Sequence, residues 1–285
     1  MKMKLECFSC FIEQAARAAR LSTENESARI RAVKRAARLI SELDTEKPPP
    51  EIATGIFRAV SEETGNPDGF KDVKHSSNRA VADLIGSIRE AIRSSDDPFE
   101  TAVKASLCGN IIDYGIFDSF DVESLIREEI CKPADKDQID RMRDIIRGSS
   151  QISFLADNAG EIGLDGLMLE EFCEINPGLR IAVMVKSAPI INDATYEDAS
   201  FFGLENRFKI CKTPATVGVN LKNITGEAAE TVRLSDYVIS KGQANYELLT
   251  DNPPERVIYL LRAKCGVVAG HIGVGMNTPV IRVSS

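Results

Sequence analysis

From residue 151 onward, short apolar runs alternate with stretches of helical periodicity, and this alternation restricts the possible folds more than any other feature. The runs are QISFLAD, RIAVMVK, FKICK, DYVISK, RVIYLLRA and PVIRVS. Short apolar runs bounded by polar residues are typical of buried strands, and strands that alternate with helices form parallel βαβ units. We therefore predict that residues 149–285 form a Rossmann-like, three-layer α/β/α domain with a mostly parallel sheet.

Residues 1–148 show helical periodicity almost throughout. Gly and Pro signals divide this region, and Lys47-Pro48-Pro49-Pro50 is the clearest break because prolines cannot continue a helix. The last proline suits the first turn of the helix that follows. We predict a helical N-terminal domain over residues 1–148, with helices near 5–22, 26–43, 49–64, 71–94, 98–109 and 123–147.

The composition is that of a soluble, globular chain. Its 285 residues are 43% hydrophobic, which is enough for a sizeable core. The formal net charge of -8 argues against a nucleic-acid surface, and the one basic run, RIRAVKRAAR, has the spacing of a solvated helix face. No apolar stretch reaches the roughly 18 residues of a membrane span, and MKMKLECFSC lacks a secretory apolar segment. We expect no nucleic-acid or membrane partner and a cytoplasmic location.

Two of the predicted strands are followed by acidic and amide side chains. Asp157 and Asn158 end the first apolar run, and Asn192-Asp193 comes shortly after the second run and its terminal Lys186. Open parallel sheets bind ligands at the carboxyl ends of their strands. Two carboxylates and an amide oxygen suit Mg²⁺ or Mn²⁺, whereas two histidines in the chain are too few for a multi-histidine zinc site. The alternative interpretation is that these acidic and amide side chains only stabilise turns and helix caps.

Polar side chains also follow two later strands. SKGQANYELL places Lys241, Gln243 and Asn245 in one loop, where Gly242 permits close approach of the backbone to a ligand, and Lys264 follows the next run. Lysines beside a metal would neutralise an anion that shares it, which favours phosphate chemistry; polar turns and solvated lysines are the alternative. Neither acidic pair lies in a G-x-G-x-x-G or G-x-x-x-x-G-K-[ST] loop, so a dinucleotide-dependent oxidoreductase is disfavoured.

Taken together, these motifs resemble those of the domain-of-unknown-function 89 family. The resemblance is carried by DNAGE at 157–161, PIINDAT at 189–195, KGQANYE at 241–247 and LLRAKC at 260–265. CFSCFIEQA and SLCGNIIDYG in the helical half extend it over essentially the whole chain. The family comprises metal-dependent damage-control phosphatases, and its CxxC-bearing microbial branch, often archaeal, is the most similar. Four ordered motifs are more specific than any one of them.

The resemblance implies a role for each strand-end residue. It implies a divalent metal (Mn, Ni, Mg or Co) held by Asp157, Asn158 and Asp193, with Glu161 beside them as a third catalytic carboxylate after Asp157 and Asp193. The attack on phosphorus would come from a metal-bound water or from an aspartate. The resemblance also implies that the substrate phosphate is held by residues of the KGQANYE loop and by two further lysines. The loop residues are Lys241, Gly242, Gln243 and Asn245, and the further lysines are Lys264 and Lys186.

Cys7 and Cys10 form a CxxC pair on or just before the first predicted helix. Their i, i+3 spacing places both thiols on one helix face, where they would pack inward. No second CxxC exists for a structural zinc site, and no strand precedes the pair as in a thioredoxin-like motif. The resemblance implies that the pair lies near the active site and supports it.

Two further expectations concern the remaining cysteines and the helical half. The chain has seven cysteines, an odd number scattered over its length, which indicates reduced thiols rather than a disulfide framework.

Asn110 and Asp113 in CGNIIDYG are spaced by three, so one helical turn would present both to the junction between the helical half and the sheet. We expect this pair to cap or brace that junction.

These observations give one leading function and two alternatives. The leading function is a metal-dependent phosphatase, a phosphoric monoester hydrolase, for small phosphorylated metabolites such as damaged or excess sugar phosphates. An S-adenosylmethionine-dependent methyltransferase would need a Gly-rich first loop and an acidic residue for the ribose hydroxyls, and only the acid is present. A non-catalytic metal-binding protein is disfavoured by the intact set of Asp157, Asn158 and Asp193. Neither the physiological substrate nor the oligomeric state follows from the sequence.

Overall fold

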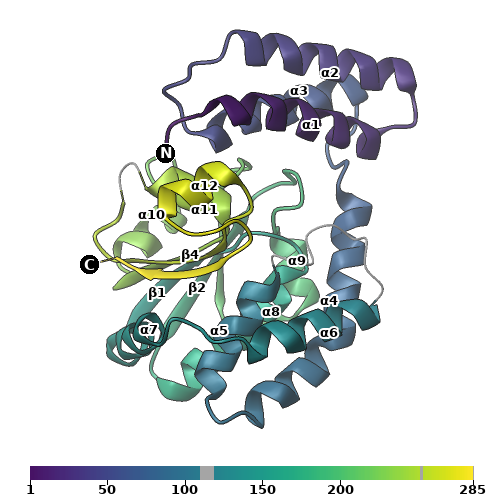
Figure 1. Cartoon of the computed structure of the whole chain (residues 1–285). Helices are drawn as coiled ribbons and strands as arrows, with labels where there is room; N and C mark the ends of the chain where they lie inside the picture. Colours follow the sequence, from purple (N-terminus) through teal and green to yellow (C-terminus); the bar gives the residue numbers. More distant parts are fainter. Residues whose placement is uncertain (110–118, 251–252, 285) are drawn as a thin grey trace.

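A central sheet organises the chain, shown in Figure 1 as a computed structural model. The structure describes residues 1–109, 119–250 and 253–284, with only the backbone described at 119–123 and 125. Asn110 and Asp113 therefore lie outside the described residues. The strands are β1 (Gln151–Leu155), β2 (Arg180–Lys186), β3 (Lys209–Thr213), β4 (Tyr237–Lys241), β5 (Val257–Arg262) and β6 (Pro279–Val283).

The strand order among the described residues is β3-β2-β1-β4-β5-β6. Strands β1 to β5 are parallel, and β6 runs antiparallel to β5 at one edge. Each strand coincides with one of the apolar runs, because strands covered on both faces need apolar side chains in both directions. The predicted Rossmann-like fold with a mostly parallel sheet is therefore confirmed.

The helices before the sheet agree with the predicted ones, with a single exception. Pro133 and Asp135 divide the helix expected at 123–147 into two, since proline breaks the backbone hydrogen bonding and Asp135 caps a new helix through Gln138 N. The helices are α1 (Leu5–Ser22), α2 (Glu26–Ser41), α3 (Pro49–Thr64), α4 (Lys71–Arg93), α5 (Pro98–Cys108), α6 (Ser119–Cys131) and α7 (Lys136–Gly148).

Helices cover both faces of the sheet. Helices α4 to α8 share a hydrophobic core with one face, to which β1 contributes Ile152 and Phe154, and α10 to α12 pack on the other face, to which β1 contributes Leu155. This alternation follows from the pleat of the strand. The helices within the second half are α8 (Glu161–Ile175), α9 (Tyr196–Phe201), α10 (Gly226–Arg233), α11 (Gln243–Leu249) and α12 (Gly266–Ile272), with a short 3₁₀ turn at Leu204–Asn206.

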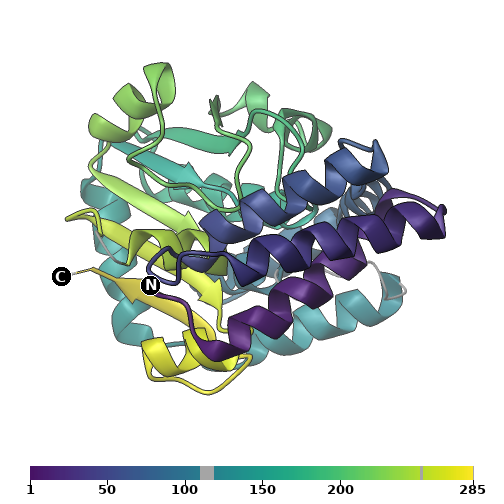
Figure 2. The same ribbon diagram turned by 90° about the horizontal axis from the view of Figure 1, so that it is seen from above.

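The first three helices form a separate cap. Helices α1, α2 and α3 share a core of their own, which also receives Ile190 and Val217 from loops of the α/β region. Figures 1 and 2 show the cap lying across one end of the sheet. The expected boundary at residues 148 and 149 thus marks where the sheet begins, whereas the packing separates α1–α3 from the rest. Within the described ranges, no helix combines the length and apolar character needed to cross a membrane.

Candidate active site

The loops that follow β1 and β2 are joined to each other at the carboxyl edge of the sheet. Ala194 N donates a hydrogen bond to Asp157 O at 2.8 Å, and Asn158 and Asp193 form an isolated antiparallel bridge. Lys186 N, at the end of β2, donates to Ala194 O at 2.9 Å. The loop pairing brings Asp157, Asn158 and Asp193 into the lining of one pocket, although the two acids are far apart in the sequence.

A strained turn precedes Asp193. Ile191 has a φ of 40°, which lies in the left-handed region that β-branched residues avoid. Asp193 N donates to Ile190 O at 3.1 Å, which closes the turn, and both isoleucines pack with the core of the cap. Unfavourable backbone conformations of this kind persist where the surroundings enforce them, often at functional sites. The cap therefore helps to hold the loop that presents Asn192 and Asp193 to the pocket.

Asp157 lies where the strand order reverses, between β1 and β4. Ligand crevices of doubly wound sheets form at this switch point. Gly242, the residue after β4, has a φ of 79°, and a Cβ atom built on it would lie 1.9 Å from Asp157 Oδ2. The carboxylate thus occupies the space that a side chain at 242 would fill. Gly242 makes room for Asp157 and is absent from the pocket lining, and its expected contact with substrate stays a prediction.

Lys241 is placed differently from the expectation. Its side chain has no solvent exposure and lies 2.8 Å from Glu161 Oε1 and 3.0 Å from Asp165 Oδ1. It also donates to the backbone and side-chain oxygens of Ser106 on α5, at 2.8 and 2.9 Å. The side chain enters the layer between the sheet and α5 and α8 and does not line the pocket, and its expected role in holding substrate phosphate stays a prediction.

Burial and ion pairing act in opposite directions on the pKa values of Lys241 and Asp165. Burial alone would lower the pKa of Lys241, but the attraction of Asp165 and Glu161 raises it overall. Burial raises the pKa of Asp165 to about 7, and its protonated form leaves Glu161 and Lys241 as a neutral pair. Asn158 Nδ2 donates to Glu161 Oε2 at 3.2 Å and to Asp157 Oδ2 at 3.1 Å. Glu161 therefore orients Asn158 from behind the pocket and does not line it.

Lys186 and Asn245 also lie outside the pocket lining. Lys186 Nζ is buried, donates to Gly218 O at 2.6 Å and lies 3.5 Å from Asp193 Oδ2. Burial lowers the pKa of Lys186, while Asp193 and Asp157 oppose that change. Asn245 accepts from Val219 N at 2.7 Å. Both side chains hold the loop before α10, and their expected binding of substrate phosphate stays a prediction.

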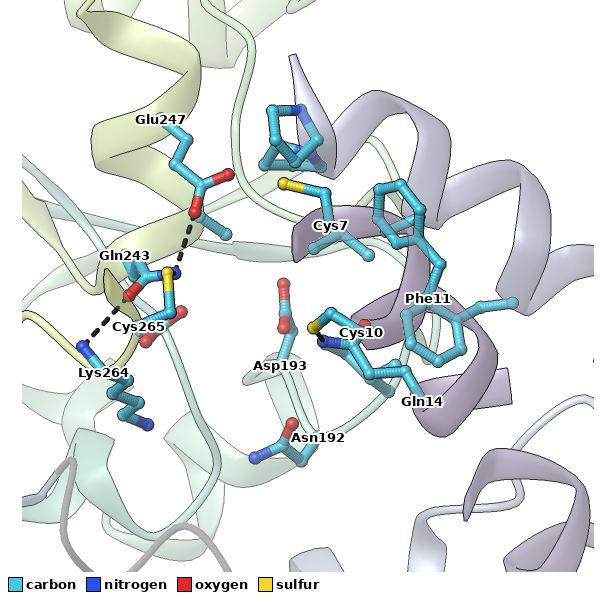
Figure 3. A pocket seen from close by; sticks show the side chains of 18 of the residues that line it. Cys7, Cys10, Phe11, Gln14, Asn192, Asp193, Gln243, Glu247, Lys264 and Cys265 are labelled. Carbon is cyan, nitrogen blue, oxygen red and sulfur yellow. Dashed lines mark hydrogen bonds between the residues drawn. The ribbon is translucent and has the colours of Figure 1, made fainter. Parts of the chain in front are cut away.

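The pocket lies between the sheet edge and the cap, and its volume is about 380 Å³ (Figure 3). Gln243 and Lys264 line it, and their expected contact with substrate phosphate stays a prediction. Gln243 is held in place because its Oε1 accepts from Lys264 N at 3.1 Å and its Nε2 donates to Glu247 Oε1 at 2.8 Å. Glu247, on α11, was not singled out from the sequence. Burial raises the pKa of Glu247 to about 7.

Both residues of the CxxC pair line the same pocket, opposite Cys265. Cys7 is buried and Cys10 is exposed, with Gln14 Nε2 donating to Cys10 Sγ at 3.1 Å. Burial is the main cause that raises the pKa of both thiols, so they stay protonated at neutral pH. All seven cysteines are free. The position agrees with a supporting role near the site.

The strand-end residues fit a hard divalent cation by the chemistry of their donors. Asp157 and Asp193 supply carboxylates, and Asn158 supplies an amide whose nitrogen is already committed to carboxylate oxygens, so its carbonyl oxygen is the atom suited to a metal. Lys186 offsets part of the negative charge of the two acids. In the described part of the chain, no three His, Cys, Asp or Glu side chains are grouped to bind a metal, which leaves this mixed set of carboxylates and amide.

A buried polar network on α4 supports the loops that carry Asn158 and Asp193, and no sequence pattern predicted it. Asn78 Oδ1 accepts from Gly160 N at 2.7 Å, and its Nδ2 donates to Asp198 Oδ1 at 2.8 Å. Lys74 Nζ lies 2.8 Å from Asp198 Oδ2. Asp198 and Thr195 form a capping box at the start of α9, which the T-x-x-D spacing does signal. Asn78 lacks any such signal because it lies within a long helix.

An oxygen-rich site at the switch point of a doubly wound sheet, covered by a helical cap, defines an α/β enzyme that acts on a small ligand. The chain belongs to the damage-control phosphatase ARMT1-like domain family, whose pattern matches residues 3–280. It is 34% identical over 282 residues to a damage-control phosphatase of Pyrococcus horikoshii, covering 96% of this chain and 95% of that protein. A damage-control phosphatase of Archaeoglobus fulgidus is 30% identical, with 99% of each chain covered.

A solved structure agrees with this assignment. The crystal structure of a DUF89 family protein from Pyrococcus horikoshii superimposes with a TM-score of 0.92 at 30% identity, covering 100% of both chains. The resemblance drawn from the four motifs is therefore confirmed at the level of the family. Membership of this family supports phosphatase chemistry and does not favour the methyltransferase or the non-catalytic alternative.

Proposed function

We propose that the protein is a metal-dependent phosphatase that hydrolyses small phosphorylated metabolites, with the metal held by Asp157, Asn158 and Asp193. The observation that carries the proposal is the convergence of these three side chains, from two loops, on a pocket that Lys264 also lines. A bound divalent cation would supply Lewis-acid polarisation of a phosphoryl oxygen. Damaged or excess sugar phosphates, which the sequence resemblance implies, are one substrate class to test against other phosphate monoesters.

The residues of the chain divide the remaining work. Lys264 contributes positive charge to the pocket, where it offsets the charge of a phosphate group. Gln243 Oε1 accepts a hydrogen bond from the backbone N–H of Lys264, which fixes the position from which the lysine side chain extends. Glu161 fixes the amide of Asn158, and Lys186 holds charge beside Asp193. These contacts pre-organise the site, so little rearrangement is needed when substrate binds.

The test is hydrolysis of 4-nitrophenyl phosphate by metal-stripped protein, with Mg²⁺, Mn²⁺, Co²⁺, Ni²⁺ or Zn²⁺ restored in turn. We expect at least one metal to restore turnover, and Asp157→Asn to lower it by roughly 100-fold or more because a ligand is lost. Metal binding is measured separately by calorimetry. Turnover that needs no metal, or an Asp157→Asn variant with wild-type turnover, would reject the proposal.

Asp236→Asn is the matched control. Asp236 Oδ2 accepts from Ser150 N at 2.6 Å and from Gln151 N at 3.1 Å, at the amino end of the sheet. The same chemical change there removes one carboxylate far from the pocket. We expect metal affinity and turnover to stay at wild-type values in this variant. If S-adenosylmethionine binds by calorimetry while no metal supports hydrolysis, the methyltransferase alternative replaces the phosphatase.

A further inference from the structure

The two sides of the pocket differ in chemistry. The sheet side carries the acids and Lys264, whereas the cap side is formed by α1, the start of α3 and Phe70. Along the middle of α1 and α3 the backbone groups bond to one another, so there the side chains are what a ligand meets, whereas the first N–H groups of a helix lack partners within it. The buried pocket-lining residues of α1 are Cys7 and Phe11, which are 8% and 4% exposed, and Phe57 of α3 contacts Phe70 edge-on. The inner cap surface is therefore aromatic and thiol-bearing.

Polar side chains of the cap also line the pocket. Glu6, Cys10 and Gln14 are spaced by four along α1, are exposed to solvent and line the pocket beside the buried stripe. Arg17 continues this line and is half-buried. Figure 3 shows Cys7, Cys10 and Phe11 on the cap side of the pocket.

Few strong hydrogen-bonding groups face this inner region from the sheet side. The amide of Gln243 already bonds to Glu247 Oε1 at 2.8 Å, to Lys264 N at 3.1 Å and to Cys265 Sγ at 3.5 Å. Glu247 is 6% exposed and lines the pocket opposite Cys7 (Figure 3). Thiols are weak hydrogen-bond partners. The amino group of Met1, which also lines the pocket, donates to Glu247 O at 2.8 Å. The inner region therefore offers a substrate a carboxyl group, an amino group, apolar surface and sulfur.

We propose that this pocket selects phosphate monoesters whose esterified group is largely apolar, with one or two hydrogen-bonding groups, over polyol phosphates. This inference rests on the proposed phosphatase function and assigns the substrate class of the same site. With phosphate at the acidic edge, the esterified group is directed toward the cap. Each sugar hydroxyl placed against Phe11 and Phe57 would lose water without gaining a partner, whereas an apolar group gains from burial there.

Two esters of the same shape test the inference on the wild-type protein. Cyclohexylmethyl phosphate has the ring and the primary phosphate ester of glucose 6-phosphate but none of its hydroxyls. We expect its kcat/KM, with the best metal, to exceed that of glucose 6-phosphate at least tenfold. Equal values, or a preference for the sugar phosphate, would overturn the inference while leaving the phosphatase intact. If neither ester nor 4-nitrophenyl phosphate is hydrolysed with any metal, the proposed function fails and the inference with it.

A variant pair identifies the surface responsible. Phe11→Leu removes aromatic surface from the pocket, and we expect it to lower kcat/KM for cyclohexylmethyl phosphate about fivefold or more while glucose 6-phosphate is unaffected. Phe8→Leu is the control, because Phe8 lies on the same helix and packs against the cap core but does not line the pocket. Equal effects of both variants on both esters would show that the cap does not select the substrate.

Discussion

Replacing Asn78 by alanine should weaken the fold and the metal site together. Asn78 is 3% exposed and joins Gly160 N to Asp198 Oδ1. Asn78→Ala leaves a buried N–H at Gly160 and a buried carboxylate oxygen at Asp198 without this partner. Each unsatisfied buried group costs about 1–3 kcal/mol, so the free energy of unfolding should fall by roughly 2–6 kcal/mol. Urea unfolding at pH 7 measures this loss.

We expect Asn78→Ala to affect the proposed metal site because both partners of Asn78 lie next to it in the chain. Gly160 belongs to the loop that carries Asn158, and Asp198 caps the helix that follows Asp193. Losing a residue that orients metal ligands typically weakens metal binding by roughly 10–100-fold. Calorimetric titration of Mn²⁺ or Ni²⁺ into folded Asn78→Ala, at a temperature well below its unfolding transition, measures this change.

Asn176→Ala is the matched control for this prediction. The amide of Asn176 donates to Ile146 O and Ser149 O, both at 2.8 Å, beside the amino end of β1. We expect a loss of stability in this variant with no change in metal affinity. If Asn78→Ala unfolds like the wild type, or if both variants bind metal equally well, the network on α4 does not position the ligand loops.

Three further changes have defined outcomes. Gly242→Ala should lower metal affinity at least tenfold by displacing Asp157, because its Cβ would lie 1.9 Å from Oδ2; calorimetry showing wild-type affinity would contradict this. Lys264→Ala should mainly raise KM for phosphate esters, and unchanged kinetics would assign that lysine to solvent. The pKa of Glu247 is raised from 4.5 to about 7 in the folded protein. Its contribution to the free energy of unfolding is therefore complete below pH 4.5, and about 3 kcal/mol of that free energy is lost as the pH rises to 7. Urea unfolding from pH 5 to 8 should show this decline relative to Glu247→Gln, and parallel profiles would exclude it.

The sequence alone predicted the order of the elements and the loops that carry chemistry. Strands covered on both faces must be apolar throughout, so their ends are visible as the first polar residues, and Asp157, Asn158 and Asp193 were found this way. The capping box of Thr195 and Asp198 is equally local. Each of these features depends on residues a few positions apart, which is why the sequence displays it.

Tertiary structure decided which way the side chain of each strand-end lysine points. Lys186, Lys241 and Lys264 all end or follow apolar runs, and the sequence treats them alike. In the fold, Lys241 pairs with Glu161, Lys186 bonds to Gly218 O, and only Lys264 of these three lines the pocket. The difference arises because a strand-end side chain turns toward whichever layer offers partners, and those partners come from distant segments.

The cap and its contribution to the site were likewise fixed only by long-range packing. Periodicity predicted six helices before the sheet, with α6 and α7 joined into one, but could not separate α1–α3, which share their own core, from α4–α7, which pack on the sheet. The same holds for Asn78, whose two partners lie 82 and 120 positions away along the chain. Local sequence thus determined which segments are helices and strands and where acids end the strands. Contacts between distant segments decided which of those polar groups face the pocket and which hold it together, since an unpaired polar group is costly to bury and most therefore bond to whichever segment the fold brings near.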